Sequence, residues 1–129
     1  MVRLGFLLLL LGGSAQACAM AGLHAQARLT LYFGRDRAGL PPVSDAAWNH
    51  FAATRLTRLF PEGFTTTQGI GQWRNPQTGQ ITQEPSIIVD VITSSDNLPA
   101  RINEAVRDYK TRFQQQSIGV VMQDVCAGF

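Results

Sequence analysis

Cysteine, histidine and lysine are scarce in this chain of 129 residues, which has two cysteines, two histidines and one lysine. Cys18 and Cys126 belong to no CxxC or His–Cys cluster, so the sequence excludes the common zinc sites and redox motifs. The sequence around His24 and His50 shows no recognisable Ser–His–Asp catalytic triad. We therefore expect neither a metal nor a cofactor.

Runs of like charge are also missing. The chain has 11 basic and 9 acidic residues, spread along its length. A nucleic-acid-binding protein needs a basic patch or stripe, and an anionic membrane surface attracts clustered basic residues. The sequence therefore predicts no nucleic-acid partner. It leaves a small polar ligand or an exported protein as the expected partner.

One hydrophobic run stands at the N-terminus. Arg3 precedes eight apolar residues at 4–11, and Ala15-Gln16-Ala17 follows in the A-x-A pattern of a signal-peptidase site. Eight residues are too few to span a bilayer, which needs about 20. We predict a signal peptide at residues 1–17, with cleavage after residue 19 or 21 as alternatives, and a periplasmic or secreted protein without a transmembrane segment.

Cys18 has three alternative fates. A cysteine after a small residue can carry the lipid of a bacterial lipoprotein, but Ala15 stands where that motif has an aliphatic residue. An exported protein can instead form a disulfide, here Cys18–Cys126, since the chain has just two cysteines. Cleavage after residue 21 would remove Cys18 altogether.

The remaining pattern predicts one α+β domain at residues 27–126, preceded by an arm at 18–26. Alternating or continuous apolar residues predict strands at 27–34, 64–74, 81–93 and 118–125. Apolar residues at helical spacing predict one helix at 45–59 and a second helix from the turn at 94–97 to about residue 115. The order βαββαβ is that of ferredoxin-like folds. We expect a four-stranded antiparallel sheet of order 4-1-3-2 with both helices on one face.

Several segments together resemble a bacterial family known as domain of unknown function 3574. They are residues 31–34 (LYFG), 58–65 (RLFPEGFT), 71–74 (GQWR), Glu84 and residues 109–117 (YKTRFQQQS). The resemblance covers nearly all of the predicted mature chain. It implies an export or lipoprotein-like N-terminus and no activity.

The predicted topology gathers distant segments at one edge of the sheet. If the first strand runs upward, its end, the end of the second strand, the start of the third and the end of the second helix meet at the upper edge. The candidate ligand-binding residues at this edge are Arg35, Gln72, Trp73, Arg74, Glu84 and Gln115. We expect Arg74 and Glu84 to form an ion pair across the hairpin.

Two functions fit this edge. The first is an exported binding or interaction module without catalytic activity. The alternative is a small enzyme acting on an anionic or carbonyl substrate, with Arg35, Arg74 and Glu84 in its site. The face of the sheet opposite the helices is half apolar, and it is a possible homodimer interface or a solvated surface. Its residues are Arg28, Thr30, Tyr32, Ile88, Asp90 and Ile92.

Overall fold

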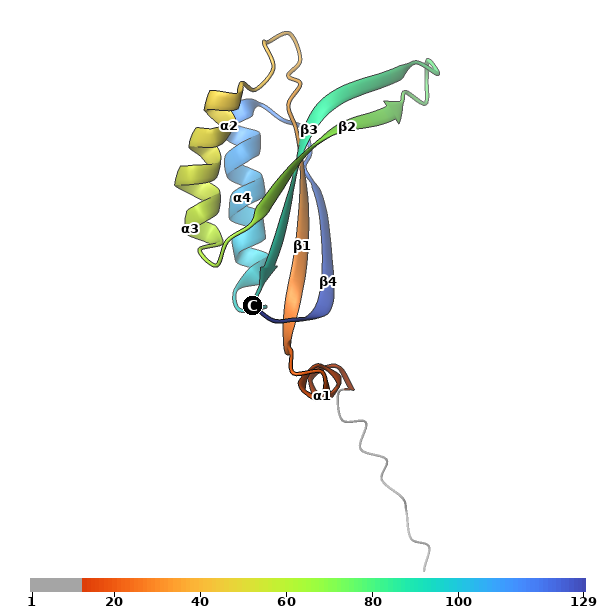
Figure 1. Cartoon of the computed structure of the whole chain (residues 1–129). Coiled ribbons are helices and arrows are strands. Elements are labelled where there is room, and N and C mark those ends of the chain that lie inside the picture. Colours follow the sequence, from red (N-terminus) through yellow and green to blue (C-terminus); the bar gives the residue numbers. More distant parts are fainter. Residues whose placement is uncertain (1–12) are drawn as a thin grey trace, which may run out of the picture.

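A computed structural model describes residues 13–129 (Figure 1). The basic and apolar parts of the predicted signal peptide, at residues 1–12, lie outside the described residues. A short helix, α1 (Gly13–Met20), precedes the sheet. Between residues 13 and 129 no helix combines the length and the apolar character needed to cross a membrane.

Four antiparallel strands form one open sheet. They are β1 (His24–Gly34), β2 (Thr65–Arg74), β3 (Ile81–Thr93) and β4 (Gly119–Ala127), in the spatial order β2-β3-β1-β4. This is the predicted order 4-1-3-2, read from the other edge. β3 has the predicted bounds. β1 starts three residues earlier than predicted, because residues 24–26 pair with residues 125–127 of β4 and so belong to the sheet rather than to a free arm.

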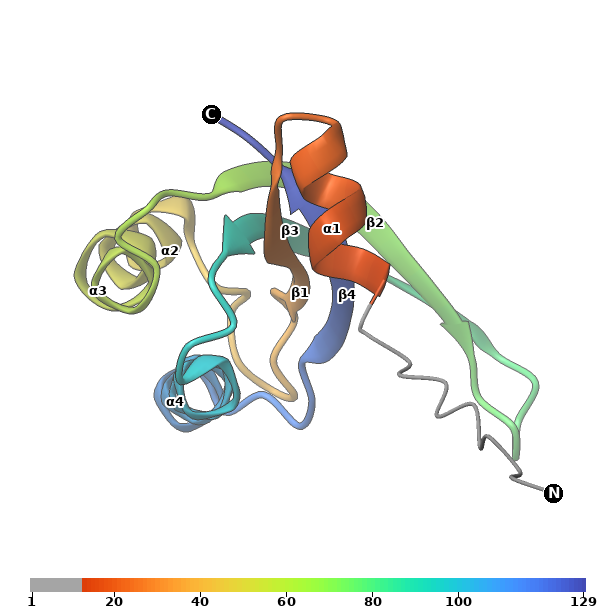
Figure 2. The ribbon, with the colours of Figure 1, turned by 90° about the horizontal axis from the view of Figure 1, so that it is seen from below.

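Two helical segments cover one face of the sheet (Figure 2). The first is a continuous helix composed of α2 (Asp45–Phe51), a π-helical segment η1 (Ala52–Leu56) and α3 (Thr57–Leu59). It starts where predicted, because the Ser44 hydroxyl accepts a hydrogen bond from the Ala47 amide at 3.1 Å. The second is α4 (Leu98–Phe113), which ends at Gln114 in a left-handed conformation (φ 54°).

The core lies between these helices and the sheet. Alternate residues of β1 and β3 are buried toward the helices, and the residues between them face the other side. Phe33 packs against Trp48, Phe51 and Tyr109, with ring centroids 4.7 to 5.9 Å apart. These aromatic contacts join the end of β1 to both helical segments.

The opposite face of the sheet, which we call the open face, is not covered by α2, α3 or α4 (Figure 2), and α1 lies below the start of β1 (Figure 1). Asp90 points to this face because side chains alternate along β3, and Arg28 pairs with it there: the guanidinium donates to both carboxylate oxygens, at 3.0 and 2.6 Å. A homodimer through this face remains a prediction.

One arginine connects the start of α4 to the end of α3 and to the end of β3. Arg101 donates to the Leu59 carbonyl at 3.2 Å, to the Thr93 hydroxyl at 3.0 Å and to the Ser94 carbonyl at 2.9 Å. Thr93 is buried, and its hydroxyl donates in turn to Glu62 at 2.8 Å. The network therefore satisfies polar groups that the core would otherwise leave without partners.

The chain is closed by a disulfide between Cys18 in α1 and Cys126 in β4, with Cα atoms 5.1 Å apart. Cys18 is buried, with 1% of its surface exposed. The bond spans 108 positions of sequence and attaches α1 to the sheet. Lipidation of Cys18 and the cleavage position remain predictions.

Candidate functional site

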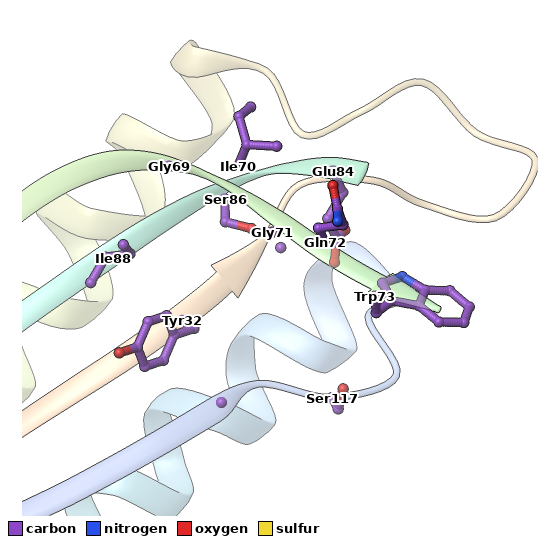
Figure 3. A pocket seen from close by; sticks show the side chains of 12 residues that line it. Tyr32, Gly69, Ile70, Gly71, Gln72, Trp73, Glu84, Ser86, Ile88 and Ser117 are labelled. Atoms are coloured by element: carbon purple, nitrogen blue, oxygen red, sulfur yellow. The ribbon is translucent and has the colours of Figure 1, made fainter. Parts of the chain in front are cut away.

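A cavity of about 360 Å³ lies on the open face, where β1 and β2 end and β3 begins (Figure 3). Its volume is within the range of small-molecule sites. The residues that line it come from all four strands and from the turn before β4. They are Tyr32, Gly34, Gly69, Ile70, Gly71, Gln72, Trp73, Glu84, Ser86, Ile88, Ser117 and Gly119.

The floor of the cavity is made of glycines. In the register of the sheet, Ser86 of β3 has Gly34 of β1 on one side and Gly69 of β2 on the other. Gly71 lies opposite Glu84, and Gly119 lies opposite Tyr32. A strand residue on this face would normally cover the sheet with its side chain. Because glycine has no side chain, the backbone is uncovered at these positions and the cavity forms above it.

Glu84 lies over this floor. Its Oε2 atom is 2.8 Å from the position that a β carbon on Gly34 would occupy, and its Cγ is 3.7 Å from the corresponding position on Gly71. A β carbon on Gly34 would therefore displace the Glu84 carboxylate, whereas one on Gly71 would meet Glu84 Cγ at an ordinary van der Waals distance. Within residues 13–129, no hydrogen bond or ion pair involves the Glu84 carboxylate, which is half-buried.

Tyr109 holds the floor from the helix side. Its hydroxyl donates to the Gly34 carbonyl at 2.9 Å. Burial raises the pKa of Tyr109 to about 12; the positive charge of Arg35 lowers it, while the negative charge of Glu84 raises it. The hydroxyl therefore stays protonated at neutral pH and keeps donating, so α4 fixes the position of the strand end beneath Glu84.

Two aromatic side chains bound the cavity. Figure 3 shows Tyr32 and Trp73 at opposite ends of it, with the glycine floor between them. Tyr32 is 43% exposed and Trp73 is 51% exposed. Trp73 therefore lies outside the core, and its half-exposed indole is accessible to a ligand.

A second cavity, of about 500 Å³, adjoins the first. Trp73, Glu84 and Ser117 line both cavities. The other residues of the second cavity come from the loop after β1, from β3 and from the end of α4. They are Asp36, Arg37, Ala38, Thr82, Gln114, Gln115 and Gln116. Gln115 donates from Nε2 to the Asp36 carbonyl at 2.6 Å, which ties that loop to the end of α4.

Four of the six predicted site residues are brought together. Trp73 and Glu84 line both cavities, Gln72 lines the first and Gln115 lines the second. Gln72 also accepts a hydrogen bond from Gln83 at 2.6 Å. The predicted proximity of these four residues is therefore observed, and their role in binding stays a prediction.

The two predicted arginines lie elsewhere. The Arg35 guanidinium donates to the Val43 carbonyl at 2.8 Å and pairs with Asp45 at 2.7 Å, so it stabilises the start of α2 and lines neither cavity. Arg74 lies opposite Ile81 and against Gly79 in the turn.

The predicted Arg74–Glu84 ion pair is wrong. The hairpin turn closes tightly, with the Asn75 amide donating to the Gln80 carbonyl at 2.8 Å. This closure pairs Gly71, and not Arg74, with Glu84.

Sequence reasoning missed the glycine floor, Tyr32, Ser86 and Ser117. One signal was present: Gly69 and Gly71 alternate and therefore face the same side of β2. Gly34 and Gly119 could be assigned to the same floor only once the register between the strands was known. Among residues 13–129, no three His, Cys, Asp or Glu side chains are grouped to hold a metal ion.

Residues 28–129 match the model of a family described as "Protein of unknown function (DUF3574)". No curated protein matches the chain. Several solved structures share the fold, and three of them follow. A phage SAM lyase in complex with S-methyl-5'-thioadenosine has a TM-score of 0.62 and 15% identity, over 95% of this chain and 92% of that one. The apo form of a phage SAM lyase has a TM-score of 0.61 and 15% identity, over 81% and 86% of the two chains.

A Bacillus cereus protein related to NIF3 has a TM-score of 0.51 and 12% identity. The match covers 89% of this chain but only 33% of that protein. At these identities the likeness shows the fold alone.

Proposed function

Since this chain belongs to the DUF3574 family of proteins of unknown function, we propose its function from the geometry of its cavities: it is an exported domain that binds a small ligand on the glycine floor. The ligand has a flat ring and a positively charged or hydrogen-bond-donating group. The ring lies on the bare backbone between Tyr32 and Trp73, and the donor reaches Glu84.

The observation that carries this proposal is the position of Glu84. A half-buried carboxylate that accepts no hydrogen bond from residues 13–129 is ready to accept one from a ligand. Glu84 is also the only charged side chain among the described residues that line the first cavity. Aromatic rings favour cations at their faces, so Trp73 and Tyr32 support the same sign of charge in the ligand.

The enzyme alternative has less support. On the glycine floor, an anionic or carbonyl substrate would need a positive side chain, and no arginine or lysine of the described residues lines the first cavity. Arg35 is paired with Asp45, and Arg74 lies in the hairpin turn against Gly79. An unpaired carboxylate alone accepts protons and hydrogen bonds, which suits a cationic ligand at least as well as a reaction. Ligand binding without catalysis is therefore the function that the side chains favour.

The remaining features are consistent with an exported binding domain. The strand order and the placement of the helices support a ferredoxin-like fold. A disulfide is typical of oxidising compartments such as the periplasm, which supports export. The phage SAM lyase, whose fold this chain shares, was solved with a nucleoside thioether bound, which makes S-methyl-5'-thioadenosine a reasonable neutral flat-ring probe.

The test is a titration of the isotope-labelled protein, followed by NMR chemical shifts, with phenethylamine, 3-phenylpropanoate and S-methyl-5'-thioadenosine. Phenethylamine should shift the Trp73 indole and the amides of the floor, and 3-phenylpropanoate should not. Glu84→Gln should weaken phenethylamine binding by roughly 10- to 100-fold, because a charge-assisted hydrogen bond contributes about 1.5–3 kcal/mol. Glu104→Gln, which removes a surface charge from α4, is the matched control.

If none of the three compounds moved a resonance of the floor, or if the anion bound as well as the amine, the cavity would not be a site for cationic ligands. Binding of S-methyl-5'-thioadenosine that does not depend on Glu84 would keep the flat-ring part of the proposal and remove the charge part.

A further inference from the structure

We propose that the two adjoining cavities form one site for a zwitterion, with an ammonium group at Glu84 and a carboxylate at Arg37, as in a free amino acid with an apolar ring. This inference rests on the proposed function, because it takes the cation site at Glu84 as given. It adds the second charge of the ligand and the residue that recognises it.

The first step is that the two cavities adjoin each other. Trp73, Glu84 and Ser117 line both of them, so Glu84 stands at the boundary between the glycine floor and the polar cavity. A ligand held by Glu84 therefore has space in both directions. The first cavity offers aromatic and backbone surface, which suits a ring, and the second offers polar side chains, which suit a charged end.

The second step is the state of Arg37. Its side chain is half-buried and its Nε donates to the Pro41 carbonyl at 2.7 Å, which fixes the guanidinium at the cavity wall. The loop that carries it is itself closed by a bridge between Arg37 and Leu40. In the described part of the chain, no hydrogen bond or ion pair uses the two terminal nitrogens of Arg37. A guanidinium fixed through Nε still has donors for a carboxylate.

The third step is that the two charges stay apart. No ion pair joins Arg37 to Glu84 anywhere in residues 13–129, although both line the second cavity. Opposite charges that face one cavity without neutralising each other match a ligand that carries both signs.

Three neighbouring residues affect how well a carboxylate fits beside Arg37. Asp36 also lines the second cavity, but its side chain is exposed and its charge is screened by solvent. Gln115 uses Nε2 for the Asp36 carbonyl and so holds the loop in place. Gln116 is exposed beside it and adds a neutral amide donor.

The experiment compares L-phenylalanine with L-phenylalaninamide, at a pH at which both amines are protonated. The two compounds differ in the carboxylate, so a site for a zwitterion should bind L-phenylalanine about tenfold more tightly, the effect of one charge-assisted hydrogen bond. Calorimetry and NMR titration of the full exported chain both report this ratio.

Variants assign the effect to Arg37. Arg37→Gln should reduce the ratio to about one while phenethylamine still binds, which also shows that the variant is folded. Arg37→Lys should keep most of the preference, because the positive charge remains. Arg107→Gln, on the exposed surface of α4, is the matched control and should leave the ratio unchanged.

The outcomes separate the two proposals. If phenethylamine binds through Glu84 but L-phenylalanine binds no better than its amide, the zwitterion proposal is overturned and the proposed function stands. If Arg37→Gln leaves the ratio unchanged, Arg37 is not the carboxylate site. If phenethylamine does not bind at all, the proposed function itself fails.

Discussion

The Oε2 atom of Glu84 lies 2.8 Å from the point where a β carbon on Gly34 would stand, so the carboxylate keeps this position only because residue 34 is a glycine. Real β carbons do not approach a neighbouring atom this closely. Gly34→Ala should therefore move Glu84 off the floor. The Glu84 side chain is flexible, so stability should change by less than about 1 kcal/mol. Phenethylamine affinity should fall severalfold.

A double-mutant cycle checks the cause of that effect. If Gly34→Ala acts through Glu84, adding it to Glu84→Gln should produce no further loss of affinity. Additive losses would show that the methyl group blocks the cavity directly.

Trp73→Ala should separate binding from stability. The indole is half exposed and lies outside the core, so the free energy of unfolding should fall by no more than about 1 kcal/mol. Phenethylamine binding should weaken by roughly five- to tenfold, because one aromatic contact is lost. Urea unfolding and the NMR titration measure the two effects. A large loss of stability with unchanged binding would assign Trp73 to the structure of the hairpin alone.

Tyr109 should make stability depend on alkaline pH. Its pKa is about 12 in the folded protein, against 10.0 for an ordinary tyrosine, because the hydroxyl is buried. Between these values the unfolded chain releases the proton and the folded chain keeps it, so the free energy of unfolding falls as pH rises from about 10 to 12. Below pH 10 the full stabilisation is present.

Tyr109→Phe checks this assignment. The variant should lack that part of the pH dependence and should lose about 1 kcal/mol at neutral pH, with the hydrogen bond to Gly34. Denaturant unfolding at pH 9 and 11 measures both. An unchanged slope between the two pH values would contradict the role given to Tyr109.

Removing the disulfide should destabilise the exported protein. The bond closes a loop of 108 positions, and loops of this length stabilise by up to about 4 kcal/mol in the chain-entropy description. The variant with Cys18→Ser and Cys126→Ser should lose about 2–4 kcal/mol in urea unfolding. The intact mass of the mature protein, with and without reductant, checks the bond itself. A diacylglycerol on Cys18, or a free thiol before reduction, would contradict it.

Arg101→Met should cost roughly 2–4 kcal/mol in the free energy of unfolding. The change leaves the buried Thr93 hydroxyl and two backbone carbonyls without their donor. Arg58→Met, which removes an exposed pair with Glu104, should cost less than about 1 kcal/mol. Equal losses in the two variants would mean that the Arg101 network adds nothing beyond a surface ion pair.

The sequence predicted the layers better than it predicted the side chains of the site. The alternation in β1 and the continuous apolar run in β3 result from burial against the helices, and burial is the property that residue patterns record. The starts of α2 and β3 follow from local chemistry in the same way, through the Ser44 cap and the turn before Ile81.

The orientation of a single polar side chain depends on tertiary contacts, and the periodicity of apolar residues in the sequence does not indicate them. Arg35 turns to Asp45 and to a loop carbonyl, and the pairing of Glu84 is set by how tightly the hairpin turn closes. The glycine floor required the same knowledge, because four glycines separated by up to 85 positions become one surface only after the strands are aligned. A shift of one residue in the pairing of any one strand would turn the glycine of that strand to the opposite face of the sheet.

The bond between Cys18 and Cys126 also determines how the domain would respond to a pulling force. Tension applied to the chain before Cys18 and after Cys126 would pass through the two sulfur atoms and bypass the sheet, so β1 to β4 would carry no load. Reduction would transfer that load to the backbone hydrogen bonds between β1 and β4, and more than 100 residues would become extensible at once. The oxidised domain would therefore behave as a short inextensible link, and its length under load would report the redox state of its surroundings.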